Sequence, residues 1–236
     1  MHVGLLECDH VEQRFRSIAG GYPEMFSGLL GAHLSELRWS CFDVCHGELP
    51  PAPETCEAYV CTGSRFSVYE PLPWIEALKN FLHRLREARI PFVGICFGHQ
   101  VLAEAFGGKV APSPAGWVVG VEDFDVLGGQ SWMEPPLARC SLQHMHQDQV
   151  SVLPAGALLL GRGDHCEVEM FALGTTLLGI EAHPEFPAAY NEALIRDRAE
   201  RIGRERAQAG LASLARPTDQ AVVGRWIAKF LREPRS

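Results

Sequence analysis

The sequence predicts a three-layer α/β fold in which helices flank a central, mostly parallel sheet. Short apolar runs alternate with amphipathic stretches along the 236 residues, which is typical of strands that alternate with helices. A buried strand also runs directly into a helix within residues 90–106, as at the ligand-binding edge of such sheets. No linker, repeat or low-complexity segment interrupts the pattern, so we expect one domain over residues 1–236.

The first half of the chain carries the clearest alternation. Apolar residues recur at helical spacing in residues 74–89, with charged residues on the opposite face. Residues 98–106 form the next predicted helix, which Gly107 and Gly108 end. An earlier helix is expected over residues 22–33. The predicted strands are 3–7, 34–42, 58–61 and 91–95.

The second half is rich in β-structure before it becomes helical. Charged residues crowd residues 196–206, which we interpret as the solvated face of a helix. The helical segments are expected over 187–209 and 218–231. The strands are expected at 117–124, 150–153, 158–161, 168–173 and 176–180.

Composition limits the classes of function. Hydrophobic residues make up 47% of the chain, but no apolar run approaches the ~20 residues of a membrane helix. A formal net charge of −8 argues against non-specific nucleic-acid binding. The N-terminus has no basic start of the secretory kind, and the eight cysteines form no disulfide framework. These observations predict a cytoplasmic protein with reduced thiols that binds neither nucleic acid nor membrane.

Cys96 is the candidate nucleophile. Residues 90–100 read Ile-Pro-Phe-Val-Gly-Ile-Cys-Phe-Gly-His-Gln, a buried strand followed by a Gly-x-Cys-x-Gly turn and a helix. Gly94 and Gly98 suit a sharp turn where two backbones crowd together. The helix dipole would favour a thiolate at Cys96, and the amide of Phe97 could help to hold an oxyanion. An isolated Gly-x-Cys is more often a core cysteine, but this setting favours a nucleophile.

His183 and Glu185 are the candidate base and its orienting group. They lie in Glu-Ala-His-Pro-Glu at the end of a late predicted strand. Pro184 biases His183 towards an extended backbone, in which residues i and i+2 face the same side. The Glu185 carboxylate can therefore approach the His183 ring, fix its tautomer and stabilise the imidazolium.

Three segments together resemble a known family. Gly94-Ile-Cys-Phe-Gly-His-Gln100, followed later by His183-Pro-Glu185, is similar to the triad-type (class I) glutamine amidotransferases. The likeness is strongest to the amidotransferase portion of GMP synthase and its stand-alone relatives, and it extends over residues 61–186. It implies a flavodoxin-like sheet and a γ-glutamyl thioester on Cys96. His183 would be the general acid and base, with Glu185 to orient it.

The resemblance also implies further site residues. Gly63 in Thr-Gly-Ser would supply a second oxyanion amide beside that of Phe97. Residues 144–149 resemble the family's loop before a strand, whose backbone would border the α-amino and carboxylate groups of the substrate. The substrate-binding residues that it implies are Ser64, Gln100, His146, Gln147 and Asp148.

Some residues depart from the family pattern or allow two interpretations. The oxyanion loop reads Gly63-Ser64-Arg65 where many relatives have Gly-Gly-Pro, so either the Gly63 or the Ser64 amide could face the oxyanion. Arg65 either binds a substrate carboxylate or pairs with a surface acid. Tyr69 and Trp74 are interpreted as packing residues.

Neither a metal nor a cofactor is predicted. Five residues could be drawn as a metal cluster, but they lack the spacing of zinc sites. They are Cys140, His144, His146, His165 and Cys166.

The predicted reaction is hydrolysis of a γ-glutamyl amide. We favour glutamine as the substrate, because the Gly-x-Cys-x-Gly-x-Gln core is similar to that of the GMP synthase type. The chain shows no nucleotide-binding glycine-rich signature, so the ammonia would pass to a separate synthetase. The alternative is a stand-alone γ-glutamyl peptidase or hydrolase. A regulator that has lost activity is a third hypothesis, which the intact triad disfavours. Related cysteine peptidases and chaperones with the same turn lack the His-Pro-Glu placement.

Overall fold

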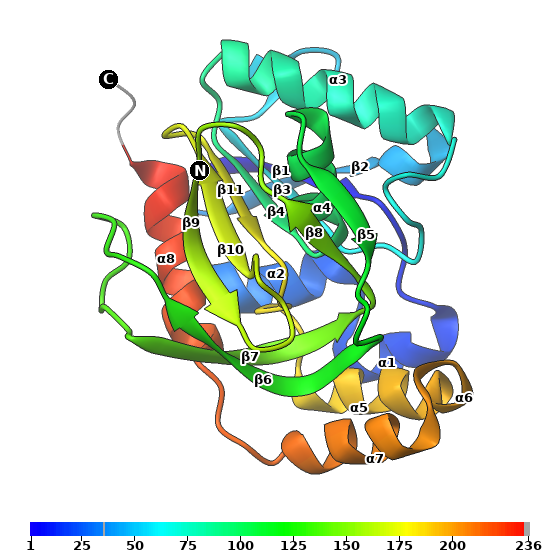
Figure 1. Ribbon diagram of the computed structural model, residues 1–236. Helices are drawn as coiled ribbons and strands as arrows, with labels where there is room; N and C mark the ends of the chain where they lie inside the picture. Colours follow the sequence, from blue (N-terminus) through cyan, green and yellow to red (C-terminus); the bar gives the residue numbers. More distant parts are fainter. Residues whose placement is uncertain (35, 234–236) are drawn as a thin grey trace.

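The computed structural model describes residues 1–34 and 36–233, and its centre is a twisted sheet (Figure 1). Residue 35, which the predicted strand 34–42 includes, lies outside the described residues, as do residues 234–236. The strands of this sheet, in spatial order, are β2 (Arg38–Asp43), β1 (His2–Glu7), β3 (Ala58–Cys61), β4 (Phe92–Ile95), β11 (Leu177–Ile180), β10 (Met170–Leu173), β9 (Ala157–Gly163), β6 (Val118–Val126) and β7 (Arg139–His146).

The sheet has a parallel half and an antiparallel half. Strands β2, β1, β3, β4 and β11 pair in parallel, so their carboxyl ends meet at one edge. The pairs β11–β10, β10–β9, β9–β6 and β6–β7 are antiparallel. The predicted three-layer α/β fold is confirmed, and its parallel strands are the ones that position the candidate site.

Helices cover both faces of the sheet (Figure 1). One apolar cluster packs α2 and α8 against the sheet, and a second packs α3 and α4 against the opposite face. The helices are α1 (Arg16–Ala19), α2 (Tyr22–Leu30), α3 (Pro73–Glu87), α4 (Phe97–Ala105), α5 (Ala188–Asp197), α6 (Ala199–Ile202), α7 (Arg204–Ser213) and α8 (Gln220–Arg232). Within the described ranges, no helix is both long and apolar enough to cross a bilayer.

Helix α3 shows how the pattern in the sequence becomes structure. Pro73 opens the helix at a position where its missing N–H costs nothing. The apolar residues at helical spacing are all buried, as predicted: Ile75, Leu78, Phe81, Leu82 and Leu85. Each buried side chain of this size contributes roughly 1.5–3 kcal/mol, so this face anchors α3 to the sheet.

Two strands and two helix breaks were not expected. Strand β7 escaped detection because its polar side chains Gln143, His144 and His146 are buried, which hides the usual alternation. β5 (Lys109–Pro112) pairs with β8 (Asp148–Val152) in a separate two-stranded sheet. The predicted helix 187–209 was wrong as one element, because it breaks at Arg198 and at Gly203, whose φ is 95°.

The segment 144–149 was predicted as a loop before a strand, and this was wrong for most of its length. β7 continues to His146 and β8 begins at Asp148, which leaves Gln147 alone between the two strands. The physical reason is again the burial of the imidazoles, which pack inside the protein as apolar strand residues would.

The turn from β4 into α4 is the most constrained part of the backbone. Cys96 has φ 51° and ψ −102°, a conformation that residues with a side chain rarely adopt. A methyl group on Gly94 would overlap the backbone carbonyl of Gly98, and one on Gly98 would lie 2.8 Å from the carbonyl oxygen of Cys61. Both glycines are therefore required where β4, β3 and α4 approach one another.

We expect Gly94→Ala to destabilise the protein by about 3 kcal/mol or more, because the clash is with backbone that cannot move aside. Gly28→Ala is the matched control, since a methyl group there meets nothing within 4 Å and lies in α2. That control should be about 0.5–1 kcal/mol more stable than the parent. Urea unfolding measures both, and equal midpoints would contradict the proposed crowding.

Candidate active site

The candidate catalytic residues meet at the carboxyl ends of three parallel strands. Cys96 follows β4, His183 and Glu185 follow β11, and Gly63 follows β3. β4 pairs with β3 on one side and with β11 on the other, so these three ends are neighbours. Ligands of α/β sheets bind at this edge.

His183 is held from several sides. Its Nδ1 lies 2.8 Å from Oε1 of Glu185, and both side chains are buried. The Phe186 ring stacks on the imidazole, with a centroid distance of 3.9 Å and an interplanar angle of 10°. The His183 backbone N–H also donates to the carbonyl oxygen of Gln143 at 2.7 Å. The ring is thus fixed in orientation, with Nδ1 rather than Nε2 occupied by Glu185, and it lines a small cavity together with Cys96.

Gly63 and Phe97 stand where oxyanion donors are expected. A Cβ atom on Gly63 would lie 2.9 Å from Cε1 of His183 and 3.7 Å from Cβ of Cys96, so the Gly63 backbone directly borders both residues. The backbone N–H of Phe97 lies close enough to the Cys96 sulfur to lower its pKa.

Burial favours the neutral form of the Cys96 thiol. It raises the pKa of Cys96 well above the ordinary value, and the carboxyl groups of Glu181 and Glu185 raise it further. The Phe97 N–H opposes this effect but does not outweigh it. The N-terminus of α4 therefore favours a thiolate, as expected, but burial has the larger effect on the Cys96 pKa.

Glu181 is a functional candidate that was missed in the sequence. It is fully buried and accepts a hydrogen bond from Nε2 of Gln100 at 2.8 Å. Its Oε2 lies 3.4 Å from Nε2 of His99, and its Oε1 lies 3.8 Å from Nδ1 of His146. Burial raises the Glu181 pKa well above its ordinary value. The i, i+2 rule that paired Glu185 with His183 would have identified Glu181 too.

Gln100 and His146, both predicted to bind substrate, line the cavity above Cys96 and are themselves held by the protein. Nε2 of Gln100 donates to the backbone carbonyl of Asp148 at 2.9 Å as well as to Glu181. Nδ1 of His146 lies 3.1 Å from the same carbonyl oxygen, and burial lowers the His146 pKa to about 4. His146 is therefore a neutral lining residue rather than a cation at neutral pH.

Ser64, Gln147 and Asp148 also line this cavity. The Ser64 hydroxyl donates to the carbonyl oxygen of Cys8 at 2.8 Å, which fastens the oxyanion loop to the end of β1. Oδ2 of Asp148 accepts from the hydroxyl of Ser67 at 2.6 Å. All of the predicted substrate-binding residues are thus brought together around one cavity, beside Cys96.

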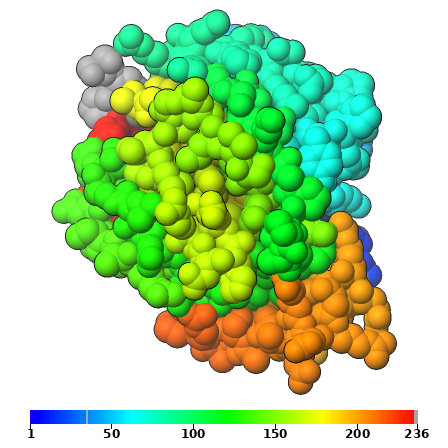
Figure 2. All heavy atoms as spheres, viewed as in Figure 1, coloured from blue at the N-terminus to red at the C-terminus, as the bar shows by residue number. Residues whose placement is uncertain are grey.

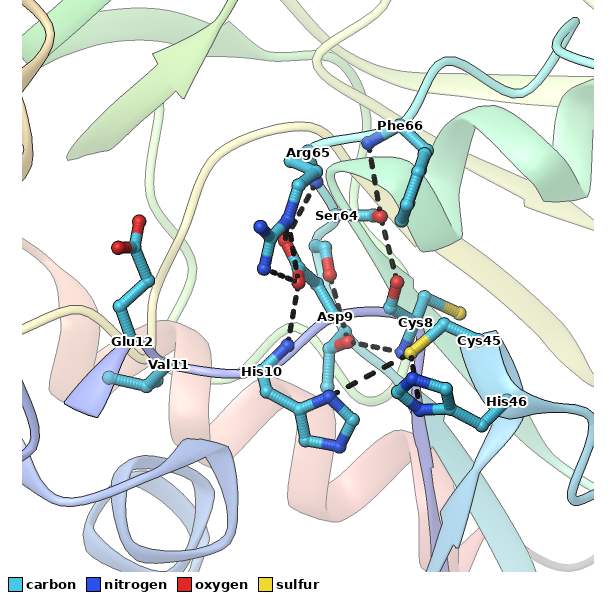
Figure 3. A network of polar contacts seen from close by, with 12 residues as sticks. Cys8, Asp9, His10, Val11, Glu12, Cys45, His46, Ser64, Arg65 and Phe66 are labelled. Atoms are coloured by element: carbon cyan, nitrogen blue, oxygen red, sulfur yellow. Dashed lines mark hydrogen bonds and ion pairs between the residues drawn. The ribbon is translucent and has the colours of Figure 1, made fainter.

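Arg65 pairs with an acid, as one of its two interpretations required. Its backbone N–H and its guanidinium both donate to the Asp9 carboxylate, at 3.0 Å and at 2.6–3.0 Å (Figure 3). Trp74 is a packing residue, with its ring 5.4 Å from that of Phe97. Tyr69 was wrongly interpreted as packing, because it is 48% exposed and lines the cavity.

Part of the cavity beside Cys96 is positively charged. The cavity has a volume of about 260 Å³, and Arg198 and Arg201 are among its lining residues. The Arg201 guanidinium lies over the Trp117 ring at 4.9 Å. In Figure 2 the orange segment that carries both arginines stands out as a lobe beside the green strands. Arg201 is exposed and Arg198 is half-buried, so the interpretation of residues 196–206 as a solvated helix face holds, although these two side chains also line the cavity.

The residues weighed as a metal cluster do not form one in the structure. Nδ1 of His144 lies 3.3 Å from Nε2 of His146. The side chains of Cys140, His165 and Cys166 do not form a ligand cluster with these two histidines. Among the described residues, a different set comes together, namely His10, Asp43, Cys45 and His46.

Because the Cys96 pKa is raised, we expect its alkylation by iodoacetamide to be slow at neutral pH and to accelerate as the pH rises. Glu181→Gln removes the carboxyl group that raises the Cys96 pKa through its electrostatic interaction and its hydrogen bond, so the alkylation profile of this variant should move to lower pH. Glu169→Gln is the control, as a buried carboxyl that is not among the causes of the shift. Peptide mass spectrometry isolates the Cys96 signal. Profiles that move equally in both variants would refute the role given to Glu181.

Comparison with known proteins agrees with this site. A family model described as "Glutamine amidotransferase class-I" matches residues 67–200. Gamma-glutamyl peptidase 4 of Arabidopsis thaliana is 33% identical over 190 residues, which cover 78% of this chain and 73% of that protein. A glutamine-hydrolysing GMP synthase subunit of Methanosarcina barkeri is 35% identical over 102 residues, 43% of this chain and 53% of that protein.

A solved structure is also similar. The crystal structure of a glutamine amidotransferase from Thermotoga maritima superposes with a TM-score of 0.79 at 20% identity, covering 99% of this chain and 100% of that one. This likeness confirms the fold. The resemblance predicted from Cys96 and the His-Pro-Glu segment is confirmed by the family match and by the relatives. The chain belongs to the class I glutamine amidotransferases, a family of amidohydrolases with a cysteine nucleophile.

Proposed function

We propose that this protein hydrolyses γ-glutamyl amides through a thioester on Cys96, with His183 and Glu185 as the other members of its triad. One observation carries the proposal. The Glu185 carboxylate holds Nδ1 of His183 at 2.8 Å, while the ring borders Gly63 beside Cys96 in a small cavity of about 30 Å³. This is the order of nucleophile, base and orienting group that thioester chemistry requires.

The first half of the reaction begins with a neutral thiol. Nε2 of His183 takes the proton of Cys96 as the sulfur attacks the γ-carbonyl carbon. The negative charge that develops on the carbonyl oxygen is held by the amides of Phe97 and of Gly63 or Ser64. His183 then gives the proton to the departing nitrogen, the C–N bond breaks, and a γ-glutamyl thioester remains on Cys96.

The second half uses the same residues with water as the nucleophile. His183 removes a proton from water, the oxygen attacks the thioester, and the sulfur leaves as the proton returns to it. The product is glutamate. Because burial disfavours a free thiolate, this transfer of the proton through His183 is required in each half.

The lining residues other than the arginines suit the glutamyl end of the substrate. Gln100 uses its Nε2 for Glu181 and Asp148, which leaves its carbonyl oxygen as the acceptor that an α-ammonium group needs. The backbone around Gln147 and the Asp148 carboxylate line the same cavity. We infer that these groups seat the α-amino and α-carboxylate groups of the substrate.

The two arginines that line the cavity, Arg198 and Arg201, favour a peptide as the leaving group. No ion pair joins the Arg198 or Arg201 side chain to a carboxylate within the described part of the chain, so two positive charges face the cavity. A γ-glutamyl peptide carries a carboxylate beyond its scissile bond, whereas ammonia carries none. A γ-glutamyl peptidase is also similar over 73% of its own length, against 53% for the GMP synthase relative. We therefore propose γ-glutamyl peptides as the substrate class.

Glutamine is the second candidate substrate. The local likeness to the GMP synthase relative favours it, and ammonia would then pass to a separate synthetase. Both candidate substrates would use the same triad and the same residues around the glutamyl group, so they differ only in the leaving group.

Substitutions in the triad test the shared chemistry. Cys96→Ala should abolish release of glutamate while the protein stays folded. Glu185→Gln should lower kcat by roughly 10⁴-fold and His183→Ala by roughly 10⁶-fold, because the first keeps a base and the second removes it. Steady-state release of glutamate measures all three, with Glu192→Gln on α5 as a surface control. Equal losses in the two triad variants would contradict these roles.

The two arginines have their own test. The double substitution Arg198→Gln/Arg201→Gln should lower kcat/KM for γ-glutamyl dipeptides by about 10–100-fold, since a hydrogen bond to a charged group contributes ~1.5–3 kcal/mol. Turnover of glutamine should hardly change. Arg196→Gln is the matched control, because Arg196 pairs with Glu192 on the same helix and lies outside the cavity. Equal losses on glutamine and on the dipeptides would eliminate a leaving-group site.

A further inference from the structure

Four potential metal ligands converge beside the oxyanion loop, outside the triad. They are His10, Asp43, Cys45 and His46, and one donor atom from each lies within 4.8 Å of all the others. Figure 3 shows the His10 and His46 rings turned towards the Cys45 sulfur. The set offers one thiol, two imidazoles and one carboxylate, which are the ligand types of zinc sites.

The fold itself brings these residues together. β1 and β2 are parallel neighbours whose last residues, Glu7 and Asp43, are paired in register. His10 follows the end of β1 by three residues, and the short 3₁₀-helix Val44–His46 continues from β2. Gly47, with φ 92°, then turns the chain away. The two segments thus meet at the ligand-binding edge of the sheet, on its outermost parallel pair.

Four of the six distances between donor atoms are close to those around a tetrahedral ion, and the other two are within 4.8 Å. Zn–S of about 2.3 Å and Zn–N of about 2.0–2.1 Å imply S···N edges of roughly 3.5–3.6 Å and N···O edges of roughly 3.3–3.4 Å. The Cys45 sulfur lies 3.7 Å from Nδ1 of His10, 3.7 Å from Nδ1 of His46 and 3.3 Å from Oδ1 of Asp43. Nδ1 of His46 is 2.8 Å from Oδ1 of Asp43, an edge that an ion would widen slightly.

The site is also open to solution. The side chains of His10 and Asp43 are 32% and 35% exposed, and that of His46 is 72% exposed, so an ion can enter without unfolding. The mixture of sulfur and nitrogen donors disfavours Ca²⁺ and Mg²⁺, which prefer oxygen ligands. We propose that His10, Asp43, Cys45 and His46 bind a divalent ion of the zinc class.

This site stands apart from hydrolysis but touches the loop that hydrolysis uses. The His10 backbone N–H donates to Oδ1 of Asp9 at 2.8 Å, and Asp9 holds both the backbone and the guanidinium of Arg65 (Figure 3). The proposed ion and the oxyanion loop therefore share one anchor, the segment that follows β1.

Titration with Co²⁺ and Zn²⁺ tests the proposal on the full chain. The parent is the Cys96→Ala variant, because its active-site thiol can no longer compete for the ion. We expect one equivalent of Co²⁺ with the sulfur-to-cobalt charge-transfer band of a thiolate ligand. Zn²⁺ should displace the cobalt and Mg²⁺ should not. A Zn²⁺-dependent rise in Tm should accompany binding.

Matched substitutions identify the ligands. Adding Cys45→Ser should remove the charge-transfer band and weaken binding by at least ~100-fold, whereas Cys41→Ser, an exposed cysteine on β2, should change neither. His46→Ala is a second substitution of a proposed ligand, chosen because the exposed His46 side chain contributes little to folding. The proposal is overturned by an absence of saturable binding, by binding that survives Cys45→Ser, or by equal loss in Cys41→Ser. A measurement of Tm in the presence of a chelator confirms that each variant is folded without the ion.

Discussion

The close approach of three backbones around Cys96 constrains the rest of the site. β4 can turn into α4 within one residue only because neither Gly94 nor Gly98 has a side chain, and Cys96 takes up the strain at φ 51°. That turn directs the sulfur to the edge where β3 and β11 also end. The loop with Gly63 and the segment with His183 are thereby delivered to the same point by ordinary parallel pairing.

Burial then determines how the proposed chemistry must proceed. A solvent-exposed cysteine at a helix N-terminus would ionise easily, but Cys96 is enclosed and faces the carboxyl groups of Glu181 and Glu185. Burial therefore favours a neutral thiol, whose proton has to move to His183 during the proposed attack. The surrounding contacts serve to orient this base. Phe186 stacked on His183 serves that orientation as directly as Glu185 does.

Local patterns in the sequence were enough to predict the contact between His183 and Glu185, the parallel half of the sheet and α3. Each depends on spacing, such as the i, i+2 relation of the first pair or the helical recurrence from Ile75 to Leu85. The errors lie where tertiary contacts override local signals. β7 was missed because its histidines are buried. For Arg65, pairing with an acid was one of two interpretations, but its partner Asp9 lies 56 positions away and could not be identified from the sequence. No single-segment pattern reports such contacts.

The break in the chain at Arg198 has a consequence for how this fold can diversify. The proposed nucleophile, its base and the oxyanion donors belong to the sheet and to α4, where any substitution disturbs tightly packed backbone. The two arginines that line the cavity belong instead to the short helix α6 and its flanks, at the periphery. Under the proposed function, insertion, deletion or replacement in this segment would change which leaving groups are accepted while the strands and α4 that carry the proposed triad stay unchanged. Selectivity and catalysis would then be able to evolve at different rates.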